Sequence, residues 1–166
     1  MDIKKVVIIG SGTMGSGIAA QVANAGIPVS LLDLPSNEGS RNQILENAKE
    51  RILQSRPPLL IEKNKIDLIS IGNIEDDFYL VEEADWIVEA VIERIDVKKD
   101  IYKKIEKIRK LDSIISSNTS TIPLKVLSAE MSDEMKKDFC ITHFFNPVRY
   151  MGLLEIVTEP INNKEK

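Results

Sequence analysis

Residues 5–15 read KVVIIGSGTMG, and this stretch decides the fold. Its opening is an apolar run rich in β-branched side chains, which is typical of a strand buried on both faces of a parallel sheet. The glycine pattern G-x-G-x-x-G follows at Gly10, Gly12 and Gly15. Apolar residues then recur at helical spacing until Gly26 provides a stop signal. The stretch therefore predicts a strand, a tight turn and a helix in succession.

This glycine pattern is suited to binding a pyrophosphate, because its glycines permit a tight turn, a close approach of backbone to ligand, and packing of helix on strand. Alone it is weak evidence, since a glycine-rich turn can be purely structural. A second predicted strand, at 28–32, ends on Asp33, 18 residues after Gly15. A carboxylate there can accept hydrogen bonds from an adenosine ribose and would repel the 2′-phosphate of NADP, which favours NAD. The residues expected to contact NAD are Gly10, Gly12, Thr13, Met14, Gly15 and Asp33.

The rest of the chain continues the alternation of strands and helices. A long amphipathic helix is predicted at 37–55; its cations Arg41, Lys49 and Arg51 could face an anionic ligand, but a plain solvated surface is the favoured interpretation. Further strands are predicted at 66–71, 86–91, 113–116, 139–143 and 153–157, and further helices at 77–83 and 96–109. About seven strands in this alternation predict a Rossmann-type, doubly wound α/β fold with a mostly parallel sheet and helices on both faces.

Length and composition narrow the functional classes. The 166 residues suffice for one domain, 1–166, and 43% apolar with 29% charged residues is the balance of a globular protein. The net charge of −4 gives no reason to expect nucleic acid as a partner. No stretch approaches the ~18 apolar residues of a membrane span, so we expect no membrane partner and a cytoplasmic location. Cys140, the single cysteine, is expected to be buried and unreactive.

Four small polar residues, SNTS at 117–120, come straight after a predicted strand. In an open parallel sheet ligands bind outside the carboxyl ends of the strands, so these side chains could contact a substrate or the nicotinamide ribose. The alternative is an ordinary loop that caps a helix, since Ser120 or Thr121 precedes Pro123 at a plausible helix start. Taken alone, the motif favours the ordinary loop.

His143 is the only histidine, and it begins the motif HFFNP at 143–147. A histidine beside aromatic residues at a strand end is more often structural than catalytic. Glu155, however, lies within the apolar run LLEIV at 153–157, where a buried carboxylate would require a partner. His143 is the natural partner. A His–Glu pair orients the imidazole and raises its basicity, which suits a general base that deprotonates an alcohol while hydride leaves the adjacent carbon.

Together these motifs resemble the NAD-binding domain of the L-3-hydroxyacyl-CoA dehydrogenases. The resemblance spans residues 3–160, and its last two motifs are the most specific. Its motifs, in order, are the glycine loop, Asp33, VEAVIE at 88–93, SNTS at 117–120, and HFFNP at 143–147 with Glu155. The resemblance implies oxidation of a 3-hydroxyacyl-CoA to the 3-ketoacyl-CoA with NAD as cofactor, in fatty-acid β-oxidation.

The same resemblance implies roles for individual residues. His143 would be the general base, Glu155 its orienting carboxylate, and Ser120 a hydrogen-bond donor near the reacting oxygen. Glu93 and Lys98 match positions that contact the ribose region of the cofactor. Asn146 matches an asparagine on the cofactor side, and no metal is implied. The family's CoA-contacting positions do not align clearly with the helix at 37–55.

Members of this family continue into a helical domain that forms a homodimer, closes over the substrate and supplies a further asparagine. This chain stops at Lys166, so we expect it to be the N-terminal part of a longer enzyme, and the segment from 56 to 90 looks closest to long fused β-oxidation enzymes.

Two alternatives to this function stay open. One is a related dehydrogenase of another hydroxy acid or sugar acid, since such enzymes share the glycine loop and Asp33. The His143–Glu155 arrangement argues against sugar-acid enzymes that use a lysine base. The other is a non-catalytic NAD-binding regulatory module, which would have no need of the set Ser120, His143 and Glu155.

Overall fold

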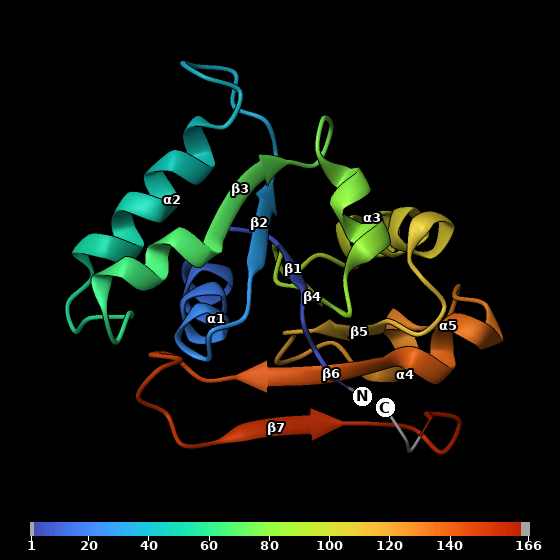
Figure 1. Ribbon diagram of the computed structural model, residues 1–166. Helices are drawn as coiled ribbons and strands as arrows, with labels where there is room; N and C mark the ends of the chain where they lie inside the picture. The colour runs from blue at the N-terminus through green and yellow to red at the C-terminus, as the bar shows by residue number, and fades with distance from the viewer. Residues whose placement is uncertain (1, 164–166) are drawn as a thin grey trace.

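The computed structural model describes residues 2–163, which form one seven-stranded sheet with helices on both faces (Figure 1). The strand order is β3-β2-β1-β4-β5-β6-β7, and only the edge strand β7 is antiparallel to its neighbour. The strands are β1 (Val6–Ile9), β2 (Val29–Asp33), β3 (Ile69–Asn73), β4 (Trp86–Glu89), β5 (Ile114–Ser117), β6 (Phe139–Phe144) and β7 (Leu154–Val157). The predicted doubly wound α/β fold is confirmed.

Three long helices cover the sheet, and shorter elements complete the layers. The long helices are α1 (Thr13–Asn24), α2 (Gln43–Gln54) and α3 (Ile95–Ile108). The short ones are the α-helices α4 (Leu124–Leu127) and α5 (Asp133–Asp138) and the 3-10 helices η1 (Lys63–Leu68) and η2 (Phe78–Glu83). No helix in 2–163 is both long and apolar enough to cross a membrane.

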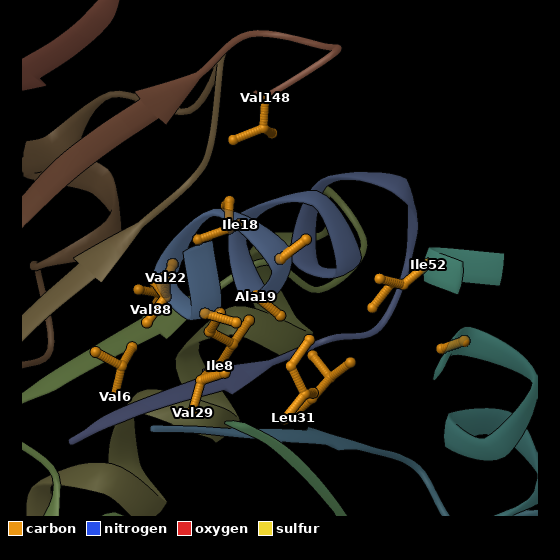
Figure 2. Packing of buried hydrophobic residues seen from close by; sticks show 14 of the residues in the cluster. Val6, Ile8, Ile18, Ala19, Val22, Val29, Leu31, Ile52, Val88 and Val148 are labelled. Atoms are coloured by element: carbon orange, nitrogen blue, oxygen red, sulfur yellow. The ribbon is translucent and has the colours of Figure 1, made fainter. Parts of the chain in front are cut away.

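The β1 strand explains why its sequence is apolar at every position. Val6 and Ile8 pack into the hydrophobic core beneath α1 and α2, beside Ile18 (Figure 2). Val7 and Ile9 point to the opposite face of the sheet, where a second core lies beneath α3, α4 and α5. Because alternate side chains of a strand enter different cores, both faces of β1 must be apolar.

The predicted site residues gather where the strand order reverses. β1 pairs with β2 on one side and with β4 on the other, and its last residue, Ile9, lies opposite Leu32 and Glu89. The loops that follow these parallel strands therefore meet at the carboxyl end of the sheet. Such a switch point is where open α/β sheets bind ligands.

Three local predictions are wrong in their bounds or incomplete. The helix expected at 37–55 begins only at Gln43, because Gly39, with φ of +72°, turns the chain, and the apolar face that packs on the sheet starts at Leu45. The strand expected at 66–71 is β3, and η1 occupies the residues just before it. Helix α4 begins at the plausible helix start after Pro123, whereas α5 was not predicted; four and six residues are too few to show a periodic pattern.

Candidate active site

The glycine loop between β1 and α1 is confined at two positions and open at a third. Gly10 has φ of +106°, and a Cβ there would lie 2.5 Å from the carbonyl oxygen of Ala90. A Cβ on Gly15 would lie 1.8 Å from the carbonyl oxygen of Gly10. At Gly12, by contrast, no described residue other than its chain neighbours has an atom within 4 Å of the Cβ position. The N-terminus of α1 is therefore open to a pyrophosphate. The glycine loop thus fits the binding of NAD.

Asp33 ends β2 beside this loop. Its Oδ2 accepts hydrogen bonds from the backbone N–H and hydroxyl of Ser11, at 2.6 and 2.7 Å, and its Oδ1 accepts one from the Leu34 N–H at 2.7 Å. A carboxylate has about four acceptor positions, so one is left for a ribose hydroxyl. Asp33 also borders a cavity of 440 Å³ whose walls are mainly apolar and include Leu34 and Ile92. Such walls can hold an adenine ring.

A second cavity, of 360 Å³, also lies at the carboxyl end of the sheet, beyond β4, β5 and β6. Six of the predicted site residues line it: Met14, Glu93, Lys98, Ser120, His143 and Asn146. Of the others, Gly10, Gly12 and Asp33 border the first cavity, Thr13 begins α1, and Gly15 packs against the loop. The structure thus brings residues from five separate segments to one place.

His143 and Glu155 form a hydrogen-bonded pair across the last two strands. Nδ1 of His143 lies 2.8 Å from Oε2 of Glu155, and the two residues are register partners in the β6–β7 ladder. The imidazole also packs on Phe145, with the ring centroids 4.5 Å apart. Because Nδ1 is engaged, Nε2 is the ring nitrogen left for a substrate in the cavity.

The expectation that Glu155 is buried and therefore requires His143 as its partner is wrong. The Glu155 side chain is 53% exposed, and all four residues of β7 are exposed, because β7 is an edge strand. No buried carboxylate demands a partner there. The strand register, and not desolvation, holds Glu155 beside His143.

The SNTS motif follows β5 and contributes in two ways. Its buried Thr119 donates a hydrogen bond to Glu93, and the Asn118 side chain accepts one from the Phe144 N–H at 3.0 Å. Ser120 is exposed and borders the cavity. It does not cap α4, whose N-cap is Pro123 without a side-chain hydrogen bond. Asn118 and Thr119 therefore fix the shape of the site, which sequence reasoning missed.

The buried ion pair beneath the cavity was also missed. Glu89 is 0% exposed at the end of β4, and its Oε1 accepts a 2.7 Å hydrogen bond from Nζ of Lys98. The same ammonium lies 3.1 Å from Glu93. Burial alone would raise the pKa of Glu93, but the hydrogen bond from Thr119 and the charge of Lys98 lower it from 4.5 to about 2. The sequence signal that could have indicated this ion pair is Glu89 itself, a glutamate in the otherwise apolar strand β4.

Comparison with known proteins now places this geometry in a family. Residues 5–165 match the family described as "3-hydroxyacyl-CoA dehydrogenase, NAD binding domain". The chain belongs to this dehydrogenase family. The predicted family and NAD as its cofactor are thereby confirmed.

Relatives of this dehydrogenase domain include a protein of Deinococcus radiodurans named as a probable 3-hydroxyacyl-CoA dehydrogenase, 44% identical over 95% of this chain and 46% of its own length. A Rickettsia felis protein provisionally named a fatty acid oxidation complex trifunctional enzyme is 46% identical over 95% of this chain and 22% of its own. The solved 3-hydroxybutyryl-CoA dehydrogenase of Escherichia coli K12 aligns with a TM-score of 0.83 and 29% identity, over 99% of this chain and 34% of that one. The chain thus spans less than half the length of these relatives.

The three cations near α2, Arg41, Lys49 and Arg51, all contact protein groups. Arg41 pairs with Glu75 and Asp76, and Lys49 donates to the Ile69 carbonyl, so both are engaged with the protein. Arg51 reaches the carbonyl oxygen of Ser11 in the glycine loop, at 3.3 Å.

Cys140 is half-buried, and its burial raises the pKa of the thiol to about 11. The thiolate is the nucleophilic form, so this cysteine is unreactive near neutral pH. Among the described residues, no group of three or more histidine, cysteine or acidic side chains could hold a metal ion.

Proposed function

We propose that this chain forms the cofactor side of the active site of an enzyme that oxidises L-3-hydroxyacyl-CoA to 3-ketoacyl-CoA in fatty-acid β-oxidation. The observation that carries the proposal is the His143–Glu155 pair, 2.8 Å apart, at a cavity also lined by Ser120 and Lys98. A cofactor domain without a reaction to catalyse has no use for an oriented imidazole there.

The glycine loop and Asp33 would hold the adenosine diphosphate half of NAD. The backbone N–H groups at the start of α1 would bind the pyrophosphate, and the free acceptor position of Asp33 would bind the ribose. Met14, Glu93, Lys98 and Asn146 would surround the nicotinamide half in the second cavity. When bound, NAD supplies the hydride acceptor.

His143 would act as the general base. Its Nε2 takes the proton of the substrate 3-hydroxyl as hydride leaves the same carbon, so that the C–O bond becomes a carbonyl. Glu155, bonded at Nδ1, holds the ring in position and stabilises the imidazolium that forms. The Ser120 hydroxyl would donate to the reacting oxygen, where charge develops as the proton leaves.

The proposal extends to the whole enzyme. We place residues 1–166 as its NAD-binding domain and expect a further helical domain to cover the substrate and to form a homodimer. The lengths of the relatives support this arrangement, since the matching segment occupies 46% and 22% of two of them. We place the enzyme in the cytoplasm.

A chimera tests the proposal. This chain would replace the matching segment of the Deinococcus radiodurans relative, and NADH oxidation would be followed with acetoacetyl-CoA. The chimera should reduce acetoacetyl-CoA. The isolated chain should do so poorly, because water is not excluded from its site. In the chimera, His143→Gln should lower kcat by ~10²–10⁴-fold at unchanged NADH affinity. Near-normal kcat in the His143→Gln chimera would refute the base assignment, and isolated-chain rates equal to those of the chimera would refute the need for a second domain.

A further inference from the structure

We infer that Glu89 is a positioning residue for cofactor binding: it holds the Lys98 ammonium at the floor of the second cavity so that one N–H of Lys98 donates to the ribose beside the nicotinamide. The inference rests on the proposed placement of NAD in that cavity. It concerns a residue that cannot reach the cofactor and acts through one that can.

Glu89 is saturated by hydrogen bonds within the protein. Oε1 accepts from Lys98 Nζ at 2.7 Å and from the Val91 N–H at 2.8 Å. Oε2 accepts from the Tyr102 hydroxyl at 2.7 Å and from the Ser117 hydroxyl at 2.6 Å. These four bonds use the roughly four acceptor positions of a carboxylate. Since Glu89 is also 0% exposed, it has neither the capacity nor the access to bind a ligand.

Lys98 is also buried, with 1% of its side chain exposed, but unlike Glu89 it lines the second cavity and has a donor to spare. Its ammonium carries three N–H donors. Two of them are directed to protein acceptors, Glu89 at 2.7 Å and Glu93 at 3.1 Å. Within residues 2–163 no third acceptor is recorded for it, although Lys98 borders the cavity. A buried donor needs an acceptor, and a ribose hydroxyl in the cavity would provide one.

The position of Lys98 depends on Glu89 because the lysine stem is flexible. Lys98 stands near the start of α3, whereas Glu89 ends β4, so their bond ties the helix to the sheet next to the cavity. The other anion within reach, Glu93, is 39% exposed and is shared with Thr119 and Thr121. An ammonium held by Glu89 is ordered before the cofactor arrives, which lowers the entropy lost on binding.

Glu89→Gln tests this, because the amide can keep the hydrogen bonds while removing the charge. Its oxygen can face Lys98, and its NH₂ can donate to the hydroxyls of Tyr102 and Ser117, which can rotate to accept. Calorimetry with the 166-residue chain would compare NADH, ADP-ribose, which retains the ribose beside the nicotinamide, and ADP, which lacks it. We expect about tenfold weaker binding of NADH and ADP-ribose and less than a twofold change for ADP.

A matched control is Asp138→Asn. It removes the charge from another buried ion pair, Arg109–Asp138 at 3.0 Å, whose residues border neither cofactor cavity. This variant should lose stability and keep its affinity for all three ligands. Equal loss of ADP and NADH binding in Glu89→Gln would overturn the inference, because it would indicate a general disturbance of the fold. Unchanged binding of all three ligands would overturn it as well.

Two further measurements keep the inference open to refutation. If Glu89→Gln does not fold, Tyr102→Phe removes one of the bonds that fix Glu89, and about threefold weaker binding of NADH and ADP-ribose with unchanged ADP is expected. No change for any ligand would count against the inference. A wild-type chain that binds ADP but not NADH would overturn both the inference and the proposed function, whereas normal wild-type NADH binding with an unresponsive Glu89→Gln overturns the inference alone.

Discussion

Glu89 and Glu155 occupy similar stretches of sequence and very different places in the sheet. Each belongs to a four-residue strand whose other members are apolar, WIVE and LEIV. β4 lies in the middle of the sheet, and Glu89 is 0% exposed with four hydrogen bonds. β7 lies at the edge, and Glu155 is 53% exposed with its recorded bond to His143. The position of the strand, and not its local sequence, decides which carboxylate is structural.

The difference in burial predicts that the two carboxylates contribute differently to the stability of the fold. Removing one partner of a buried ion pair leaves an uncompensated charge and typically costs about 3–5 kcal/mol, whereas an exposed pair contributes about 0–1 kcal/mol. Glu89 therefore matters to the fold and, through Lys98, to the arrangement of the site. Loss of Glu155 should therefore cost the fold little, and the role proposed for it is to orient His143.

The largest effect is expected from Lys98→Met. This change leaves the Glu89 carboxylate buried without a cation, and we expect the free energy of unfolding in urea to fall by about 3–5 kcal/mol. The double variant Glu89→Gln/Lys98→Met has no unpaired charge and should recover at least half of the loss. If the free energy of unfolding of Lys98→Met lay within about 1 kcal/mol of the wild-type value, the buried pair would be no more stabilising than the exposed pair of the edge strand.

The second effect concerns the edge strand. In the chimera, Glu155→Gln should lower kcat on the order of 10²-fold, because the imidazole loses the carboxylate that stabilises its charged form. The unfolding free energy should change by less than about 0.5 kcal/mol, because the pair is exposed. A stability loss as large as that of Lys98→Met would show that Glu155 is structural after all.

A third carboxylate, Asp33, lies between these extremes, since it ends an interior strand but is only half-buried. Asp33→Asn should narrow the preference for NAD over NADP by about tenfold, because the repulsion of the 2′-phosphate is removed. Dissociation constants for both cofactors, measured by calorimetry, check this. Comparable constants in the wild-type chain would contradict the assignment of Asp33.

The local parts of this site could be predicted from the sequence, whereas the physical reasons for its non-local pairings could not. The β1 strand, the glycine loop and α1 are adjacent in the chain, so their spacing alone indicated a pyrophosphate site. The His143–Glu155 pair was predicted for a reason that the structure removes, because a four-residue apolar strand does not reveal whether it lies at an edge. A buried carboxylate does require a partner, but the carboxylate that is buried is Glu89.

The partner of Glu89 shows why it was overlooked. Lys98 follows it by nine residues in a different element, and only the packing of α3 on the sheet brings the two together. The bounds of α2 were misjudged for a related reason, since that helix begins where its apolar face meets the sheet and not where its charged residues begin. Element type follows from pattern, whereas ends and pairings follow from packing.

The smallest predicted effect concerns Glu93, which shares Lys98 with Glu89 but is partly exposed. Its pKa is lowered from 4.5 to about 2 in the folded chain, so the folded state favours its ionised form. The stability this contributes is fully present above the unfolded pKa of 4.5 and is lost as pH falls toward 2.

Because the side chain is 39% exposed, solvent screening limits the contribution to less than about 1 kcal/mol. Urea unfolding of wild type and Glu93→Gln at pH 5, 4 and 3 isolates it, since the other carboxylates are common to both proteins. The wild-type advantage should shrink steadily over this range. A constant difference would mean that Lys98 is committed to Glu89 alone, and the ion pair would then end at the buried side of the cavity without reaching its rim.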